Sequence, residues 1–118
     1  HKRGWDARWK EFSDQAERGK AAHAELTQLV DRDTDAFNVL MECFGLPKSN
    51  DAEKAARTAA IQAATKGATE VPLRVMEVAL ASMDVIEAMA REGLPSSISD
   101  AGVGALCARA AVRGAGLN

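Results

Sequence analysis

The sequence predicts an all-α fold, an antiparallel bundle of about five helices. Residues 1–118 are expected to form a single helical domain that is part of a larger one. Of the 118 residues 24 are Ala, whereas Val, Ile and Thr together number 16 and Tyr is absent. Ala loses no side-chain entropy in a helix, and sheets prefer β-branched and aromatic residues, so this composition argues against a β-sandwich or barrel. Apolar residues also recur every three to four positions, the period of an amphipathic helix.

The first predicted helix covers about residues 5–16. Trp5, Trp9 and Phe12 recur at the spacing that places them on one helical face. We interpret both tryptophans as anchors of the core rather than as groups that stack on a ligand. Gly19 is predicted to bend or end this helix.

A second helix is predicted from about residue 21 to residue 44, because the apolar period continues from Leu26 to Phe44. Gly45 has the character of a C-cap, and Pro47 follows it two positions later. The connection to the next helix is therefore expected to be a short turn.

The third predicted helix covers about residues 51–67. Ser49 or Asn50 is expected to cap it, because Glu53 stands three positions after Asn50 as in a capping box. Its many alanines would let a neighbouring backbone approach closely.

The fourth predicted helix covers about residues 73–89. Pro72 removes one helical hydrogen bond and is expected to mark a kink or a fresh start. Gly93 and Pro95 are expected to end the helix.

The last predicted helix runs from about residue 100 to residue 114, with Ser97 or Ser99 as its cap. Ala and Gly make up much of it. Small side chains on its surface indicate tight helix–helix contact, either within the chain or between chains.

Asp33 breaks the apolar pattern. At about 100° per residue, Asp31 and Asp35 point about 160° away from it. The apolar side chains within about 40° of it are those of Leu26, Leu29, Phe37, Leu40 and Phe44. A carboxylate on the apolar face is costly to bury, so Asp33 needs a bonding partner or a cleft to face. A structural Asp bonded to a neighbouring helix and a functional acid/base both fit the pattern.

Charge and length exclude several functions. Fifteen Lys and Arg oppose 17 Asp and Glu, a net charge of −2, so no nucleic-acid partner is expected. No apolar run reaches the roughly 18–20 residues of a membrane span, and no signal peptide is visible, so a cytoplasmic location is expected. Cys43 and Cys107 are interpreted as small core residues. Two histidines without metal-ligand spacing predict no metal site.

Several segments match one known family in order and spacing. The matching segments are residues 29–38 (LVDRDTDAFN), 44–48 (FGLPK), 59–66 (AAIQAATK), 70–73 (EVPL), 99–106 (SDAGVGAL) and 114–118 (GAGLN). The chain resembles the cyclodeaminase domain of formiminotransferase–cyclodeaminase and the related bacterial methenyltetrahydrofolate cyclohydrolases. Residues 2–14 look like the bacterial branch. The family domain is longer, with a Gly-rich segment before this region and more helix after it, so the resemblance covers its central portion.

The resemblance implies a folate enzyme that acts without a cofactor or metal. The substrate would be 5-formiminotetrahydrofolate, in the lyase step of histidine degradation that yields 5,10-methenyltetrahydrofolate and ammonia. The resemblance assigns the acid/base role to Asp33, the second Asp of the family motif. It also implies a homo-oligomer, a dimer or larger, and a formiminotransferase domain in the parent protein. The further candidates for folate contact are Ser99, Asp100, Gln62 and Lys66, with Arg74 and Arg109 for the anionic tail.

The chemistry explains the need for one carboxyl group. N10 of the folate attacks the formimino carbon and must lose a proton, whereas ammonia leaves well only when it gains one. A single carboxyl group serves both needs by relaying the proton. The folate itself holds N10 close to the reacting carbon.

Two other interpretations remain open. One is methenyltetrahydrofolate cyclohydrolase activity on the same scaffold, since hydrolysis of the neighbouring folate can use a similar carboxyl group. The other is a helical assembly module without catalysis, which the small-residue last helix favours. For Ser99 and Asp100, helix capping is the structural alternative to an anion site at a helix start.

Overall fold

The computed structural model describes residues 6–118, and this part of the chain is helical and contains no strand. It comprises two short 3₁₀ helices and three long α-helices: η1 (Asp6–Arg8), α1 (Trp9–Phe44), α2 (Asp51–Glu92), η2 (Pro95–Ser97) and α3 (Ile98–Ala115). The predicted all-α class is confirmed. The prediction of about five helices is wrong for the described residues, because two expected breaks do not occur.

The two expected breaks, at Gly19 and Pro72, lie inside continuous helices. A Cβ added to Gly19 would lie 3.7 Å from Cγ1 of Val85, so α2 packs directly beside this glycine. Pro72 is buried within α2, and Val71 beside it joins the buried cluster around Leu29. Tertiary packing of one face stabilises a helix more than local propensity does, which explains why neither residue ends its helix.

The connection between α1 and α2 has the expected capping chemistry. The backbone N–H of Gly45 donates to the carbonyl of Glu42 at 3.0 Å. Asn50 Oδ1 accepts from the backbone N–H of Glu53 at 2.8 Å, and Glu53 Oε2 accepts from the N–H of Ser49 at 2.7 Å. These reciprocal bonds satisfy backbone donors that the helix start leaves free. The predicted C-cap at Gly45 and N-cap at Asn50 are confirmed.

The start of α3 differs from the prediction. The helix begins at Ile98, so Ser99 and Asp100 lie inside its first turn. Ser97 occupies the N-cap position, but its side chain makes no capping hydrogen bond. The reason is that η2 runs directly into α3: the N–H of Ser97 donates to the carbonyl of Leu94 at 2.8 Å, and its φ and ψ of −107° and 15° are not the extended values of a capping residue.

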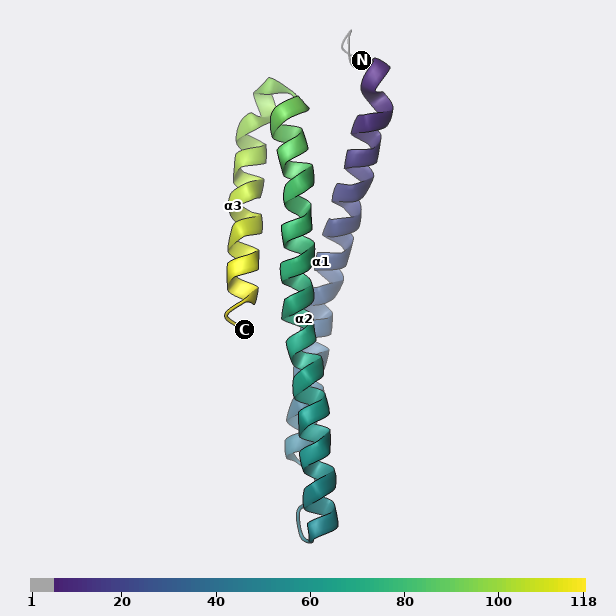
Figure 1. Cartoon of the computed structure of the whole chain (residues 1–118), viewed down its shortest axis with the longest axis vertical. Coiled ribbons are helices and arrows are strands. Elements are labelled where there is room, and N and C mark those ends of the chain that lie inside the picture. Colours follow the sequence, from purple (N-terminus) through teal and green to yellow (C-terminus); the bar gives the residue numbers. More distant parts are fainter. Residues whose placement is uncertain (1–5) are drawn as a thin grey trace.

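Helices α1 and α2 form a long antiparallel hairpin, and α3 folds back beside the C-terminal half of α2 (Figure 1). Ion pairs across the hairpin fix its register, since the two residue numbers add to about 100 in each: Arg8–Glu92 at 2.8 Å, Arg18–Asp84 at 3.8 Å and Arg74–Glu25 at 2.6 Å. The far half of the hairpin consists of α1 and α2 alone. The molecule is consequently a rod of 75 × 23 × 15 Å.

The core is thin. Besides Pro72, the buried residues of the described chain are Leu29, Val71, Val78, Ala79 and Ala108. Trp9 is 67% exposed, so its predicted role as a core anchor is wrong, while Trp5 lies outside the described residues. Cys43 is half-buried, but Cys107 is exposed, which corrects its assignment to the core. A periodic apolar face predicts which side of a helix tends to be buried, but not whether another helix packs against it.

Candidate functional site

Asp33 lines a groove of about 730 Å³ where all three helices meet. We call it the Asp33 groove. Helix α1 supplies one wall, α2 supplies Pro72 and Val75, and the end of α3 supplies the other wall. Its residues are Leu26, Leu29, Val30, Asp33, Thr34, Pro72, Val75, Ala111, Gly114, Ala115, Leu117 and Asn118. The volume falls within the range of small-molecule sites.

Asp33 is half-buried on the inner side of α1, next to the buried Leu29. Within residues 6–118, no hydrogen bond or ion pair engages its carboxylate. The hydroxyl of the neighbouring Thr34 donates to the Val30 carbonyl at 3.3 Å, inside its own helix. The sequence led us to expect that Asp33 either bonds to a partner or faces a cleft. In the described residues it faces a cleft.

The turn of α1 before the groove is held to α2 by Arg74. Its Nε and Nη2 donate to the two carboxylate oxygens of Glu25 at 2.6 and 3.0 Å, and its Nη1 donates to Glu77 at 3.0 Å. These bonds lower the pKa of the Glu25 carboxyl and raise the pKa of the guanidinium. Arg74 is thus engaged with two carboxylates, and it does not line the Asp33 groove.

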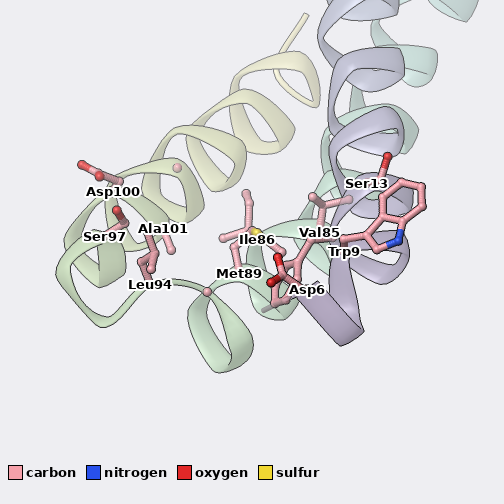
Figure 2. A pocket seen from close by; sticks show the side chains of 13 residues that line it. Asp6, Trp9, Ser13, Val85, Ile86, Met89, Leu94, Ser97, Asp100 and Ala101 are labelled. Atoms are coloured by element: carbon pink, nitrogen blue, oxygen red, sulfur yellow. The ribbon is translucent and has the colours of Figure 1, made fainter. Parts of the chain in front are cut away.

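A second cavity, of about 890 Å³, lies at the other end of α3. We call it the Trp9 groove. It is lined by Asp6, Trp9, Phe12 and Ser13 near the start of α1, by Val85, Ile86, Met89, Gly93 and Leu94 near the end of α2, and by Ser97, Asp100, Ala101 and Gly104. Figure 2 shows Asp100 at one end of this cavity and Trp9 at the other, with Met89 between them. Its walls are mainly apolar.

The candidate site residues predicted from the sequence do not lie in one groove. Asp100 lines the Trp9 groove and Asp33 lines the other. At about 1.5 Å per residue, Asp100 and Gly114 are about 21 Å apart along α3. One small ligand in the Asp33 groove would therefore not reach Asp100. Ser99 is exposed and lines neither groove.

The remaining candidates also lie outside both grooves. Gln62 and Lys66 are exposed on α2, and Lys66 Nζ lies 4.0 Å from Glu70 Oε1. By the register of the hairpin, Lys66 is near the level of Asp33, yet it does not line the groove. Arg109 is exposed on α3. Folate contacts by these residues stay predictions.

Sequence reasoning missed the groove residues that come from α3 and the turn after it. Gly114 and Asn118 both line the Asp33 groove. The turn is closed by the N–H of Leu117, which donates to the Gly114 carbonyl at 3.1 Å, and by the N–H of Asn118, which donates to the Ala115 carbonyl at 3.3 Å. One signal was visible in the sequence: residues 114–118 (GAGLN) are among the segments that match the family.

The chemistry available in the Asp33 groove is proton transfer by one carboxyl group. A carboxylate without a bonding partner can accept a proton from a ligand and return it. Within residues 6–118, no group of three or more His, Cys, Asp or Glu side chains is placed to hold a metal ion. None of the helices described for this chain is both long and apolar enough to cross a bilayer.

The sequence matches known proteins over most of its length. Residues 1–118 match the family model described as formiminotransferase-cyclodeaminase. The chain is 44% identical over 102 residues to a methenyltetrahydrofolate cyclohydrolase from Methylorubrum extorquens, with 86% of the chain and 49% of that protein covered. It is 36% identical over 98 residues to formimidoyltransferase-cyclodeaminases from Mus musculus and Rattus norvegicus, with 83% of the chain and 18% of each protein covered. The chain thus spans about half the length of the first relative and under a fifth of the others.

Proposed function

The chain belongs to the formiminotransferase-cyclodeaminase family, and from this premise we propose that its protein processes a one-carbon unit carried by a tetrahydrofolate, with Asp33 as the proton relay. The observation that carries the proposal is a half-buried carboxylate, without a partner in residues 6–118, in a groove of about 730 Å³. The folate class is supported by the relative named methenyltetrahydrofolate cyclohydrolase.

The 44% identity to that relative favours hydrolysis of 5,10-methenyltetrahydrofolate as the reaction. Water attacks the carbon that bridges N5 and N10, and the Asp33 carboxylate accepts a proton from it. The hydroxyl group of the resulting adduct releases its remaining proton to solvent water as the C=O bond forms. The C–N5 bond breaks, its electron pair stays on N5, and Asp33 returns a proton to N5. The product is 10-formyltetrahydrofolate. Water, the folate and one carboxyl group supply every atom and proton, so the step needs no metal or redox cofactor.

The second candidate is the cyclodeaminase reaction, which the matches to the formimidoyltransferase-cyclodeaminases favour. N10 attacks the carbon of the protonated formimino group of 5-formiminotetrahydrofolate and passes its own proton to Asp33, which leaves an amino group on that carbon. The protonated Asp33 then donates to the departing nitrogen, the C–N bond to it breaks, and ammonia leaves. For this reaction we also propose a formiminotransferase domain in the parent protein.

Replacing Asp33 tests the proposal for both reactions. We expect Asp33→Asn to lower kcat by about 10²–10⁴-fold, because the amide cannot relay a proton, with a smaller effect on KM. Asp35→Asn is the matched control, since Asp35 belongs to the same motif but is exposed. Ammonia release from formiminotetrahydrofolate and loss of methenyltetrahydrofolate absorbance identify the reaction.

Three results separate the alternatives. An Asp33→Asn variant that keeps the wild-type kcat on the active substrate would refute the role of Asp33. A wild-type protein that neither binds nor converts either folate would support the non-catalytic assembly module. Loss of kcat in both Asp33→Asn and Asp35→Asn would indicate a folding effect, which far-UV circular dichroism of the variants would reveal.

We also propose that the protein is a homo-oligomer. Large apolar side chains on all three helices are more than half exposed, among them Phe37, Leu80 and Leu106. Exposed apolar surface of this extent typically marks an interface. Asp100 lies about 21 Å from Gly114 along α3, and Ser99 is next to it. Gln62 and Lys66 line neither groove. Any role of these residues in folate binding would therefore have to come through the tail of the substrate or a neighbouring chain.

A further inference from the structure

Gly114 has no packing reason to be glycine. It lies in the last turn of α3 and lines the Asp33 groove. A Cβ built on it would meet no atom within 4 Å outside its own stretch of helix, and its φ does not lie in the left-handed region. In the described structure, therefore, no neighbouring element and no backbone conformation excludes a side chain at this position.

A glycine inside a helix lowers the stability of the fold relative to alanine, because the unfolded glycine backbone has more conformational freedom to lose. Gly104 offers a contrast in the same helix, since its built Cβ would lie 3.7 Å from Cδ1 of Ile86 on α2. That glycine faces a neighbour and Gly114 faces open space. The open space beside Gly114 adjoins the groove that holds Asp33.

The walls of the groove are unequal in bulk. Helix α1 contributes branched and polar side chains, including Leu29 and Asp33, whereas α3 contributes Ala111, Gly114 and Ala115. A flat ring lying against the α3 wall at Gly114 would touch backbone atoms. An added methyl group there would displace the ring toward α1, and displacement by about 1 Å can cost roughly 10²-fold in rate.

We infer that Gly114 determines which ligands the Asp33 groove admits, by leaving the space in which the ring system of a folate lies against the backbone of α3. This inference rests on the proposed function, and it adds a residue that sets substrate fit through the shape of the groove rather than through proton transfer.

The test compares two alanine variants of the same helix in the whole protein. Gly114→Ala fills space beside the groove. Gly102→Ala is the matched control, because its built Cβ also meets nothing within 4 Å, yet Gly102 lines neither groove and points about 120° away around the helix. We expect both variants to keep or raise the wild-type Tm, by up to about 5 °C.

The kinetic readout is made with methenyltetrahydrofolate and formiminotetrahydrofolate, using whichever the wild type converts. We expect Gly114→Ala to lower kcat/KM by about 10–100-fold and Gly102→Ala to change it less than about 2-fold. A larger side chain in Gly114→Val should lower it further. This ordering of effects, with a retained Tm, is what a purely structural glycine would not produce.

Three outcomes would overturn the inference. The first is an unchanged kcat/KM in Gly114→Ala. The second is an equal loss in both alanine variants. The third is a change in the mass of the assembly while kcat/KM per chain stays constant, which would assign the space to a neighbouring chain. A wild type inactive on both folates would instead refute the proposed function, and the same assay reports it.

Discussion

Arg74 makes the best-formed link between α1 and α2 at the scale of single residues. Its guanidinium donates hydrogen bonds to both carboxylate oxygens of Glu25, and this bidentate arrangement is stronger than a single ionic hydrogen bond. The Arg74 side chain is 47% exposed and the Glu25 side chain 35%, so water weakens the pair. The pair matters mainly because it makes stability depend on pH.

The first prediction concerns that pH dependence. The pKa of Glu25 is lower in the folded chain than in the unfolded one, so the pair stabilises the fold above the unfolded value and is lost as pH falls through the folded value. We expect the Tm of the wild type to fall more than that of Glu25→Gln between about pH 5 and pH 3. Thermal melts across this range measure it. Glu87→Gln, which removes a pair with Arg91 inside α2, is the control. Parallel curves for wild type and Glu25→Gln would contradict the prediction.

The sequence could predict Asp33 but not its surroundings. Helical periodicity alone placed Asp33 on one face with Leu26 and Leu29, and all three line the same groove. Phe37 was placed on this face too, yet it is 57% exposed. The opposite wall of the groove comes from Gly114 and Asn118, some 80 residues later in the chain. Periodicity fixes directions around one helix axis and carries no information about which helices meet.

At the scale of elements, glycine positions in the helices are set by what lies next to them. Gly19 faces Val85 at a normal van der Waals distance, so an added methyl group would fit. At Gly93, which ends α2, a Cβ would overlap the carbonyl oxygen of Met89. That oxygen also accepts the Gly93 N–H at 2.9 Å, so it is held in place.

The second prediction follows from this contrast. We expect Gly19→Ala to stabilise the protein by up to about 1 kcal/mol, because alanine favours the helix and fits beside Val85. We expect Gly93→Ala to destabilise it by about 1 kcal/mol or more, since the helix end must shift. Urea unfolding of the two variants measures both. Destabilisation by Gly19→Ala, or a neutral Gly93→Ala, would show that the packing around these glycines is not as described.

Capping could be predicted from the sequence, and helix continuity could not. Asn50 and Glu53 bond to backbone groups within a few residues, so local sequence contains the whole interaction. Gly19 and Pro72 weaken a helix locally, but contacts with Val85 and with the Leu29 cluster lie outside any local window. The same limit explains Ser97, which has the right residue type but the wrong backbone angles for a cap.

At the scale of the whole molecule, the chain is too extended to bury its apolar residues. The radius of gyration over Cα atoms is 20.8 Å, against about 13–14 Å for a compact domain of this length. Leu80, Val103 and Leu106 are at least 60% exposed. A rod of three helices has no second layer to cover its outer faces, which is why a small set of residues forms the core.

The third prediction is therefore self-association. We expect size-exclusion chromatography with light scattering to give the chain a mass at least twice 12.5 kDa. Leu106→Glu should lower that mass, because a charge on an apolar interface is costly. Arg113→Glu, which replaces an exposed charged residue of α3, should leave it unchanged. A monomer at all concentrations, with no effect of Leu106→Glu, would rule the prediction out.

The place where α3 stops divides the rod into a thick end of three helices and a thin end of two, and the Asp33 groove lies on that boundary. Local opening begins where packing is least, so the thin end should fray first, from the turn at residues 45–50 back toward Asp33. A ligand in the groove touches both sides of the boundary. Bound there, it would stabilise the two-helix end against local opening. Amide exchange in the far hairpin should then slow even at residues that the ligand does not contact.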